Sequence, residues 1–313
     1  MTELALRPPV VLITGVGGFI GGFLARDLAS RGYQVIGTCR SRDRLAAAVR
    51  HACFCVHEVA MGKETEWSNY TNSVDVVIHA AAHVHIRKPT KNDRQLFRVV
   101  NIEGTRALVE SCRDSDVKLF INLSSIAVNL FDATNHEGCY GWSKRIAEQV
   151  VAEIFGCGLT RYINLRLPAV YGPGMRGGLA SLFKLVHRGL PLPIPAGAEP
   201  RSYLGVLNLA CCIRHCISHL PKRSCTVAIA DPLPVDLRGL ITLMASATGR
   251  RPVLISVSDG VLKFGSWLLG REQELRRVLT GHRVDLSAAL EHLEWAPTKD
   301  AAECWAQSIK NSA

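Results

Sequence analysis

Three glycines spaced three residues apart constrain the fold of this chain more than any other feature of its sequence. Gly15, Gly18 and Gly21 follow the segment PVVLIT, whose β-branched apolar residues are typical of a buried parallel strand. A helix is predicted directly after them, over residues 19–31. Glycine lets the backbone turn tightly and approach a pyrophosphate, which the amide groups at the helix start, including those of Phe19 and Ile20, can bind.

Further strands and helices alternate along the first half of the chain. Strands are predicted over residues 9–14, 34–38, 74–80, 117–123 and 160–165, and long helices over residues 19–31 and 95–112. This alternation predicts a doubly wound parallel α/β sheet of the Rossmann type. Beyond Tyr171 the sequence becomes rich in glycine and proline. We therefore expect a dinucleotide-binding domain over residues 1–170 and a smaller substrate-binding lobe over residues 171–313, partly interleaved with the sheet.

A second motif, YGWSK, places Tyr140 and Lys144 four residues apart, hence on one face of a predicted helix. A tyrosine has a pKa near 10, so it is a poor acid–base catalyst at neutral pH unless a cation stabilises the phenolate. Lys144 can provide that cation and lower the pKa of Tyr140. Ser125 follows an apolar strand, at the edge of the sheet where ligands of such folds bind.

Composition favours an anionic small ligand. The 313 residues include 37 Lys and Arg against 27 Asp and Glu, a formal charge of +10. The basic residues are dispersed and aromatic residues make up 6%, so no nucleic-acid module is expected. The apolar segment of residues 260–270 is too short to span a bilayer and contains Lys263, so no integral membrane segment is expected.

The cysteines indicate a reducing compartment. Eleven of them are scattered along the chain without a paired framework, which favours a cytoplasmic protein. Only one dense cluster has spacing that could suit a metal, and it comprises Cys211, Cys212, His215, Cys216 and His219. It lacks a CxxC pair and is interleaved with isoleucines, so helix packing is the preferred interpretation and no metal site is expected.

Taken together, the motifs resemble the extended short-chain dehydrogenases/reductases, the NAD(P)-dependent epimerase/dehydratase family. The similar segments, in family order, are TGVGGFIG, DVVIHAAA, VNIEGT, NLSSIAVN, YGWSK and LRLPAVYGPG. The resemblance implies a catalytic set of Ser125, Tyr140 and Lys144. It also implies that the cofactor site includes Ala80, Ala81, Ala82, Asn101, Pro168 and Val170, with the last two against the nicotinamide.

The residues after the second strand bear on cofactor choice. NAD-binding units commonly have an acidic residue here that binds the ribose hydroxyls. This chain has Cys39 and then Arg40, with Arg42 and Arg44 close by, which suits the 2′-phosphate of NADP. The same segment contains the acidic Asp43, and its arginines can also form a basic turn exposed to solvent. NAD therefore stays possible.

The C-terminal half resembles the sugar-binding lobe of bacterial enzymes that process UDP-linked N-acetylated hexoses for surface polysaccharide. By this resemblance Arg201 meets the nucleotide diphosphate, a task suited to a guanidinium, and Arg276 assists. Gly178 takes a substrate-binding position where many relatives have asparagine. Family members often dimerise through two helices that correspond to residues 95–112 and 142–155, so a homodimer is expected.

These observations lead to one main hypothesis and two rivals. The main hypothesis is the reduction by NADPH of a UDP-4-keto-6-deoxy-N-acetylhexosamine at C4. A 4-epimerase acting on UDP-glucose or UDP-N-acetylglucosamine would use the same residues but would retain its cofactor through the cycle. A non-catalytic dinucleotide sensor is the rival from another class, although such proteins commonly lose the tyrosine or the lysine, and both are present here.

Overall fold

The structure, a computed structural model, describes residues 7–84, 89–129, 139–156, 158–195, 197–258, 260–261 and 281–310. The chain divides into two compact units. Unit 1 consists of residues 1–167, 210–228 and 287–295, and unit 2 consists of residues 168–209, 229–286 and 296–313. The first break falls close to the boundary expected from the sequence, and two later segments of the chain return to unit 1.

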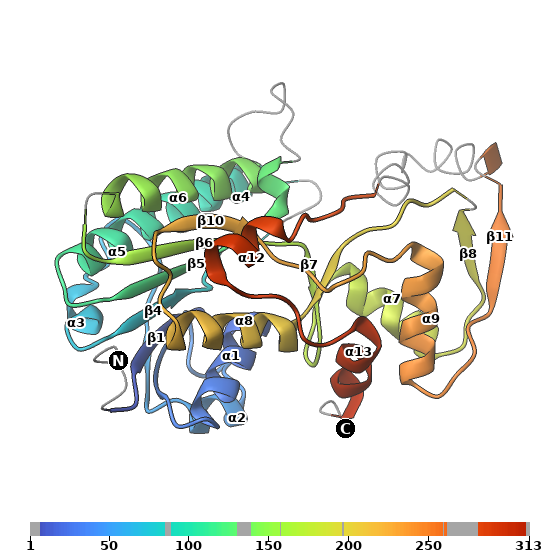
Figure 1. Ribbon diagram of the computed structural model, residues 1–313, viewed down its shortest axis with the longest axis horizontal. Helices are drawn as coiled ribbons and strands as arrows, with labels where there is room; N and C mark the ends of the chain where they lie inside the picture. The colour runs from blue at the N-terminus through green and yellow to red at the C-terminus, as the bar shows by residue number, and fades with distance from the viewer. Residues whose placement is uncertain are drawn as a thin grey trace. The chain divides into compact units, whose positions relative to one another are not determined.

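Unit 1 is built on a parallel sheet with the strand order β10-β6-β5-β4-β1-β2-β3 (Figure 1). The strands are β1 (Val10–Thr14), β2 (Gln34–Cys39), β3 (Cys55–Glu58), β4 (Val76–His79), β5 (Leu119–Ser125), β6 (Arg161–Leu167) and β10 (Cys225–Ala228). The order reverses at β1, between β4 and β2. Because parallel strands share a carboxyl edge, the segments after β1, β2, β4 and β5 meet at the place where such sheets bind ligands.

Helices cover both faces of this sheet, which makes it doubly wound. In chain order they are α1 (Phe19–Ala29), α2 (Ala47–Ala52), α3 (Ser68–Thr71), α4 (Lys91–Leu96), α5 (Gly104–Arg113), α6 (Tyr140–Phe155), α8 (Val206–Ser218) and α12 (Ser287–Leu293). Helices α5 and α6 lie on one face, and α1 lies on the other (Figure 1). An ion pair between Asp27 of α1 and Arg214 of α8 joins two helices of that second face.

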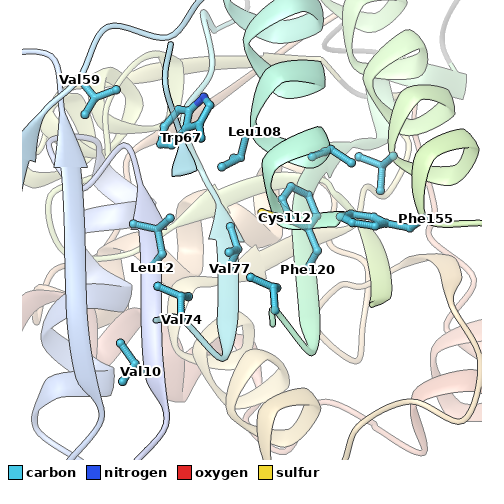
Figure 2. Close-up of a cluster of buried hydrophobic side chains, with 13 residues drawn as sticks. Val10, Leu12, Val59, Trp67, Val74, Val77, Leu108, Cys112, Phe120 and Phe155 are labelled. Atoms are coloured by element: carbon cyan, nitrogen blue, oxygen red, sulfur yellow. The ribbon is translucent and has the colours of Figure 1, made fainter. Parts of the chain in front are cut away.

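The main core of unit 1 lies between the sheet and the helices α5 and α6. Figure 2 shows Leu12, Val77 and Phe120 of three neighbouring strands pointing toward Leu108 of α5 and Phe155 of α6. All five side chains are buried, and each contributes about 1.5–3 kcal/mol relative to exposure. This core fixes α6, and with it Tyr140 and Lys144, against the strand that ends at Ser125.

The described part of unit 2 contains two short parallel strand pairs and three helices. The pairs are β7 (Ala169–Tyr171) with β9 (Tyr203–Gly205) and β8 (Leu192–Pro195) with β11 (Leu254–Val257), and the helices are α7 (Gly178–His187), α9 (Leu237–Ala247) and α13 (Ala301–Lys310). The ring of Tyr171 stacks on Trp305, with centroids 4.3 Å apart. The Tyr171 hydroxyl donates to the buried Asp231 carboxylate at 2.7 Å, which links the first and second segments of this unit.

The structure confirms the doubly wound α/β class but changes one element. A single helix is expected over residues 95–112, whereas α4 and α5 are joined by a π-helical segment, η2 (Phe97–Glu103). The segment is only seven residues long and has α-helix on both sides, so the sequence pattern does not reveal it. Wide turns of this kind are frequent at functional sites, and this one contains Asn101.

No helix within the described ranges is long and apolar enough to cross a membrane. The apolar segment of residues 260–270 falls almost entirely outside those ranges.

Candidate active site

The glycine-rich turn is packed so closely that side chains are excluded from it. Gly15 has a φ of +75°, and a Cβ there would lie 2.8 Å from Cα of Ala81, which follows β4. A Cβ on Gly21 would lie 2.9 Å from the carbonyl carbon of Gly15. The glycines therefore bring β1, α1 and the segment after β4 into direct backbone contact, as the sequence predicts.

This turn fits a dinucleotide. Helix α1 begins at Phe19, and its N-cap residue, Gly18, has no side chain that could accept hydrogen bonds from the first-turn amides. The amides of Phe19 and Ile20 thus sit at the positive end of the helix, which favours an anion. A pyrophosphate is the expected ligand of this glycine-rich turn.

A buried hydrogen-bonded chain connects the turn with helix α5. His79, at the end of β4, contacts the Thr14 hydroxyl through Nδ1 at 2.8 Å and the Thr105 hydroxyl through Nε2 at 3.0 Å. Thr105 donates to the backbone oxygen of Asn101, and Thr14 accepts from the amide of Ala81. Burial lowers the pKa of His79 to about 3, with Lys144 adding to the effect, so the imidazole is neutral and acts as a structural connector.

Asn101 holds the segment after β4 in place. Its Oδ1 accepts from the amide of His83 at 2.7 Å, and its Nδ2 donates to the His83 carbonyl and to the Ser143 hydroxyl, both at 3.0 Å. Asn101 is buried, and the π-helical turn directs it across to α6. It therefore links His83, in the segment after β4, with Ser143 of α6.

Ser125 and Tyr140 are hydrogen-bonded to each other where β5 ends and α6 begins. Burial raises the pKa of Tyr140 to about 12, and the bond with Ser125 only partly opposes that rise. The expectation that Lys144 lowers the pKa of Tyr140 is therefore wrong for this structure, because loss of solvation dominates. Tyr140 is a neutral phenol at physiological pH, and a neutral phenol can donate a proton.

Lys144 lies one helical turn after Tyr140 and is 2% exposed. Burial lowers its pKa to about 8, and the nearby Glu148 carboxylate partly opposes this fall. A cation buried here needs a negative partner, since an isolated ammonium is costly to bury. Lys144 is thus charged at neutral pH but close to titration.

Glu148 and Arg166 form a network behind the catalytic set that sequence reasoning missed. Arg166 of β6 donates from Nη2 to Glu148 Oε2 at 2.7 Å and from Nε to Oε1 at 3.1 Å. The Ser124 hydroxyl, next to Ser125, donates to the same carboxylate. The spacing of Glu148, four residues after Lys144, was visible in the sequence, but the partner from β6 becomes evident only with the sheet register, in which Ser124 and Arg166 are opposite each other.

The end of β2 carries the residues that the sequence analysis connects with cofactor choice. Cys39 is buried and Arg40 is exposed immediately after it. Arg42 is used structurally, since its guanidinium donates to the Val56 carbonyl. Sequence reasoning missed Glu58, which is paired in register with Cys39 and accepts the amide of Arg42 at 3.1 Å.

The predicted residues that remain lie in unit 2, and the structure describes four of them. Pro168 and Val170 lie at the start of this unit, and Gly178 is the first residue of α7. Arg201 forms an antiparallel bridge with Val235, and its side chain is hydrogen-bonded to Tyr203. Arg276 lies outside the described residues.

Among the side chains that the structure describes, no group of three or more His, Cys, Asp or Glu could hold a metal ion. In the cysteine and histidine cluster of α8, Cys212 and Cys216 are buried, and the ring of His215 is 2.9 Å from the Leu293 carbonyl.

The fold and site define a dinucleotide-binding α/β enzyme with a Ser–Tyr–Lys set. The sequence model of the "NAD dependent epimerase/dehydratase family" matches residues 11–228, more than half of the chain. The chain belongs to this family and is an enzyme that depends on a nicotinamide dinucleotide.

Relatives and solved structures extend the similarity to nearly the whole chain. A UDP-glucose 4-epimerase of Vibrio cholerae is 29% identical, covering 97% of this chain and 95% of its own length. A ceramide reductase of Caulobacter vibrioides is 27% identical, covering 92% and 86%. The UDP-glucuronic acid 4-epimerase of Bacillus cereus, solved with UDP-glucuronic acid and NAD, has a TM-score of 0.75 at 18% identity, covering 96% of this chain and 98% of its own; this likeness concerns the fold.

Proposed function

We propose that this enzyme uses NADPH to reduce the C4 ketone of a UDP-4-keto-6-deoxy-N-acetylhexosamine, a step in surface polysaccharide synthesis. The observation that carries the proposal is the arrangement of the Ser–Tyr–Lys set, in which the Tyr140 hydroxyl is hydrogen-bonded to Ser125 and lies one helical turn from Lys144. The UDP-sugar class is supported by the relative from Vibrio cholerae, which acts on UDP-glucose.

Each residue of the set has a distinct task in this reaction. Tyr140 donates its proton to the carbonyl oxygen as negative charge develops there, and Ser125 hydrogen-bonds the same oxygen. Lys144 stabilises the resulting phenolate until solvent returns the proton, and it would also hold the nicotinamide ribose. A nicotinamide held in this site would supply the hydride for the new C–H bond.

The glycine-rich turn and the segment after β4 would hold the cofactor. Gly15, Gly18 and Gly21 let the turn before α1 pack tightly on backbone, and Ala80, Ala81 and Ala82 follow β4 next to that turn. The exposed Arg40 is placed to meet a 2′-phosphate at the end of β2. NADP is therefore the proposed cofactor, in a family that is named for NAD.

Epimerisation at C4 is the second candidate function. It is favoured by the relative from Vibrio cholerae, a UDP-glucose 4-epimerase similar over almost the full length of both chains. An epimerase needs the same tyrosine to remove a proton before it returns one. Net consumption of NADPH therefore distinguishes the two reactions: a reductase consumes one NADPH per product, whereas an epimerase consumes none.

Arg40→Ala is expected to weaken NADPH binding by roughly 10- to 100-fold while changing NADH binding little. One charge-assisted contact with a phosphate contributes about 1.5–3 kcal/mol, and only NADPH has the 2′-phosphate. Calorimetry of both dinucleotides measures the two affinities. Lys222→Ala is the matched control, because it removes an exposed cation of unit 1 that pairs with Glu294. Equal or tighter binding of NADH by the unaltered protein would contradict the NADP assignment.

Arg201→Ala is expected to weaken UDP binding by roughly 10- to 100-fold and to leave dinucleotide affinity unchanged, because a guanidinium binds a diphosphate through paired, charge-assisted hydrogen bonds. Competition between UDP and the substrate provides the measurement. Arg188→Ala, at the exposed end of α7, removes the same charge from unit 2 and serves as control. If UDP does not bind at millimolar concentration, the UDP-sugar proposal is wrong and a sterol-like or flavonoid-like ketone becomes the better candidate.

Arg283 is a candidate second arginine in the same unit. It is exposed and lines a cavity of about 370 Å³ together with Glu199, Pro200 and Gly281. Burial lowers the pKa of His282, which is next to Arg283 in the chain, and the charge of Arg201 lowers it further.

A cytoplasmic location stays a prediction from the cysteine content. A homodimer through the helices of residues 95–112 and 142–155 stays a prediction from the resemblance.

A further inference from the structure

Both elements that carry the catalytic set, β5 and α6, meet the neighbouring strand β6 at one buried carboxylate. Glu148 lies on α6, one turn beyond Lys144, and is 6% exposed. It accepts the Ser124 hydroxyl from the end of β5 and two nitrogens of Arg166 from β6. Burying a carboxylate is costly unless it is paired and hydrogen-bonded, and Glu148 meets that requirement with partners from two strands.

The same network reaches the residues on either side of Ser125. Ser124 precedes Ser125 in β5, and Arg166 also contacts the Asn129 side chain at 3.4 Å, in the short helix η3 (Ile126–Asn129) that follows Ser125. Glu148 thus ties α6, which begins with Tyr140, to the segment that positions Ser125. A change at Glu148 would alter both the charge near Lys144 and the position of the serine.

The charges around Lys144 give Glu148 a particular importance. From β4, Lys144 is faced by the neutral His79; from its own helix it is faced by Tyr140, also neutral, and by Glu148. Arg166 of β6 reaches the site through Glu148. The Glu148 carboxylate is therefore the negative group that stabilises the Lys144 ammonium. Arg166 pairs with the same carboxylate and so weakens that stabilisation.

We propose that Glu148 is a positioning residue of the catalytic set: held by Ser124 and Arg166, it ties α6 to the end of β5 beside Tyr140 and places a carboxylate one helical turn from Lys144. This inference rests on the proposed roles of Tyr140 and Lys144. It assigns to Glu148 an electrostatic effect that a purely structural ion pair would not have.

The direction of the effect follows from the sign of the charges. A carboxylate close to an ammonium favours the charged form and raises its pKa, typically by one to three units when the groups are within a few ångströms. Glu148→Gln keeps the side-chain shape but removes the charge, so the pKa of Lys144 should fall by about one unit. Arg166→Met removes the competing cation and should shift the pKa of Lys144 upward.

The experiment measures the pKa of Lys144 directly by NMR of the protein labelled at lysine side-chain carbons, with the resonance assigned by its loss in Lys144→Met. The pH profile of kcat/KM is recorded in parallel, and its alkaline limb should move in the same direction as the pKa. Asp27→Asn is the control, because it removes the carboxylate of a different, half-buried ion pair, with Arg214, and should shift neither quantity.

A downward shift in Glu148→Gln together with an upward shift in Arg166→Met supports the proposal. An unchanged Lys144 pKa in a folded Glu148→Gln protein overturns it, even if activity falls uniformly at all pH values. If Glu148→Gln does not fold, Arg166→Met decides alone: an upward shift supports the proposal and no shift overturns it. Because the NMR titration does not depend on turnover, this outcome is separate from a failure of the proposed function, which Tyr140→Phe reveals.

Discussion

Tyr140→Phe should lower kcat by about 10² to 10⁴-fold while leaving the fold and dinucleotide affinity essentially unchanged. The substitution removes the proton donor and keeps the ring, and general acid–base groups typically contribute a factor of this size. The ring itself packs near Phe97, with centroids 6.1 Å apart, a contact that phenylalanine preserves. Single-turnover kinetics isolates the chemical step from product release.

Neighbouring variants should give a distinctive pattern. Ser125→Ala is expected to be milder, because water or the Ser124 hydroxyl can partly replace its hydrogen bond. Lys144→Met should reduce both turnover and cofactor affinity, since Lys144 is proposed to act on both. Tyr70→Phe, which removes a hydroxyl from a tyrosine that packs against Trp67 elsewhere in unit 1, should have no effect. A Tyr140→Phe enzyme that keeps most of its single-turnover rate would refute the mechanism.

Gly15→Ala should destabilise the protein by about 2–5 kcal/mol and eliminate measurable dinucleotide binding. Two costs add: about 1–2 kcal/mol for a non-glycine residue at positive φ, and about 1–3 kcal/mol for forcing a methyl group into a closely packed site. The methyl group would meet the backbone of Ala81, which cannot move without displacing the segment after β4. Urea unfolding of the dinucleotide-free protein measures the first effect and calorimetry the second.

Gly32→Ala is the matched control for the steric cost. Gly32 also has a positive φ, +85°, but a Cβ there would meet nothing within 4 Å. Its destabilisation should be limited to the backbone strain, about 1–2 kcal/mol, and dinucleotide binding should persist. Equal destabilisation by the two substitutions would show that close approach to Ala81 is not what requires glycine at position 15.

Local patterns in the sequence predict the parts of this site that depend on short spacings. The strand, glycines and helix around Gly15, and the pairing of Tyr140 with Lys144, each follow from residues within a few positions of one another. Their backbone geometry is set locally, by the turn that glycine permits and by the period of the α-helix. The structure accordingly contains the strand and helix on either side of the glycines, and it places Tyr140 and Lys144 one turn apart in α6.

Features that depend on partners distant in sequence could not be predicted in this way. The π-helical turn at Asn101 reflects hydrogen bonds to His83 and Ser143, which only the assembled fold brings near. Likewise Arg166 reaches Glu148 because β5 and β6 align in a particular register. The high pKa of Tyr140 depends on burial, so the spacing of Lys144 alone gave the wrong sign.

Net reduction at C4 is tested most directly by following the transfer of deuterium from NADPH to the sugar. The purified enzyme would be incubated with a UDP-4-keto-6-deoxy-N-acetylhexosamine and NADPH deuterated at the transferring position of the nicotinamide, and the product examined by NMR. We predict one equivalent of NADPH oxidised per product formed, with deuterium at C4 of the sugar. Interconversion of UDP-hexoses at C4 with no net oxidation of NADPH, and no reduction of the 4-keto sugar, would contradict the claim.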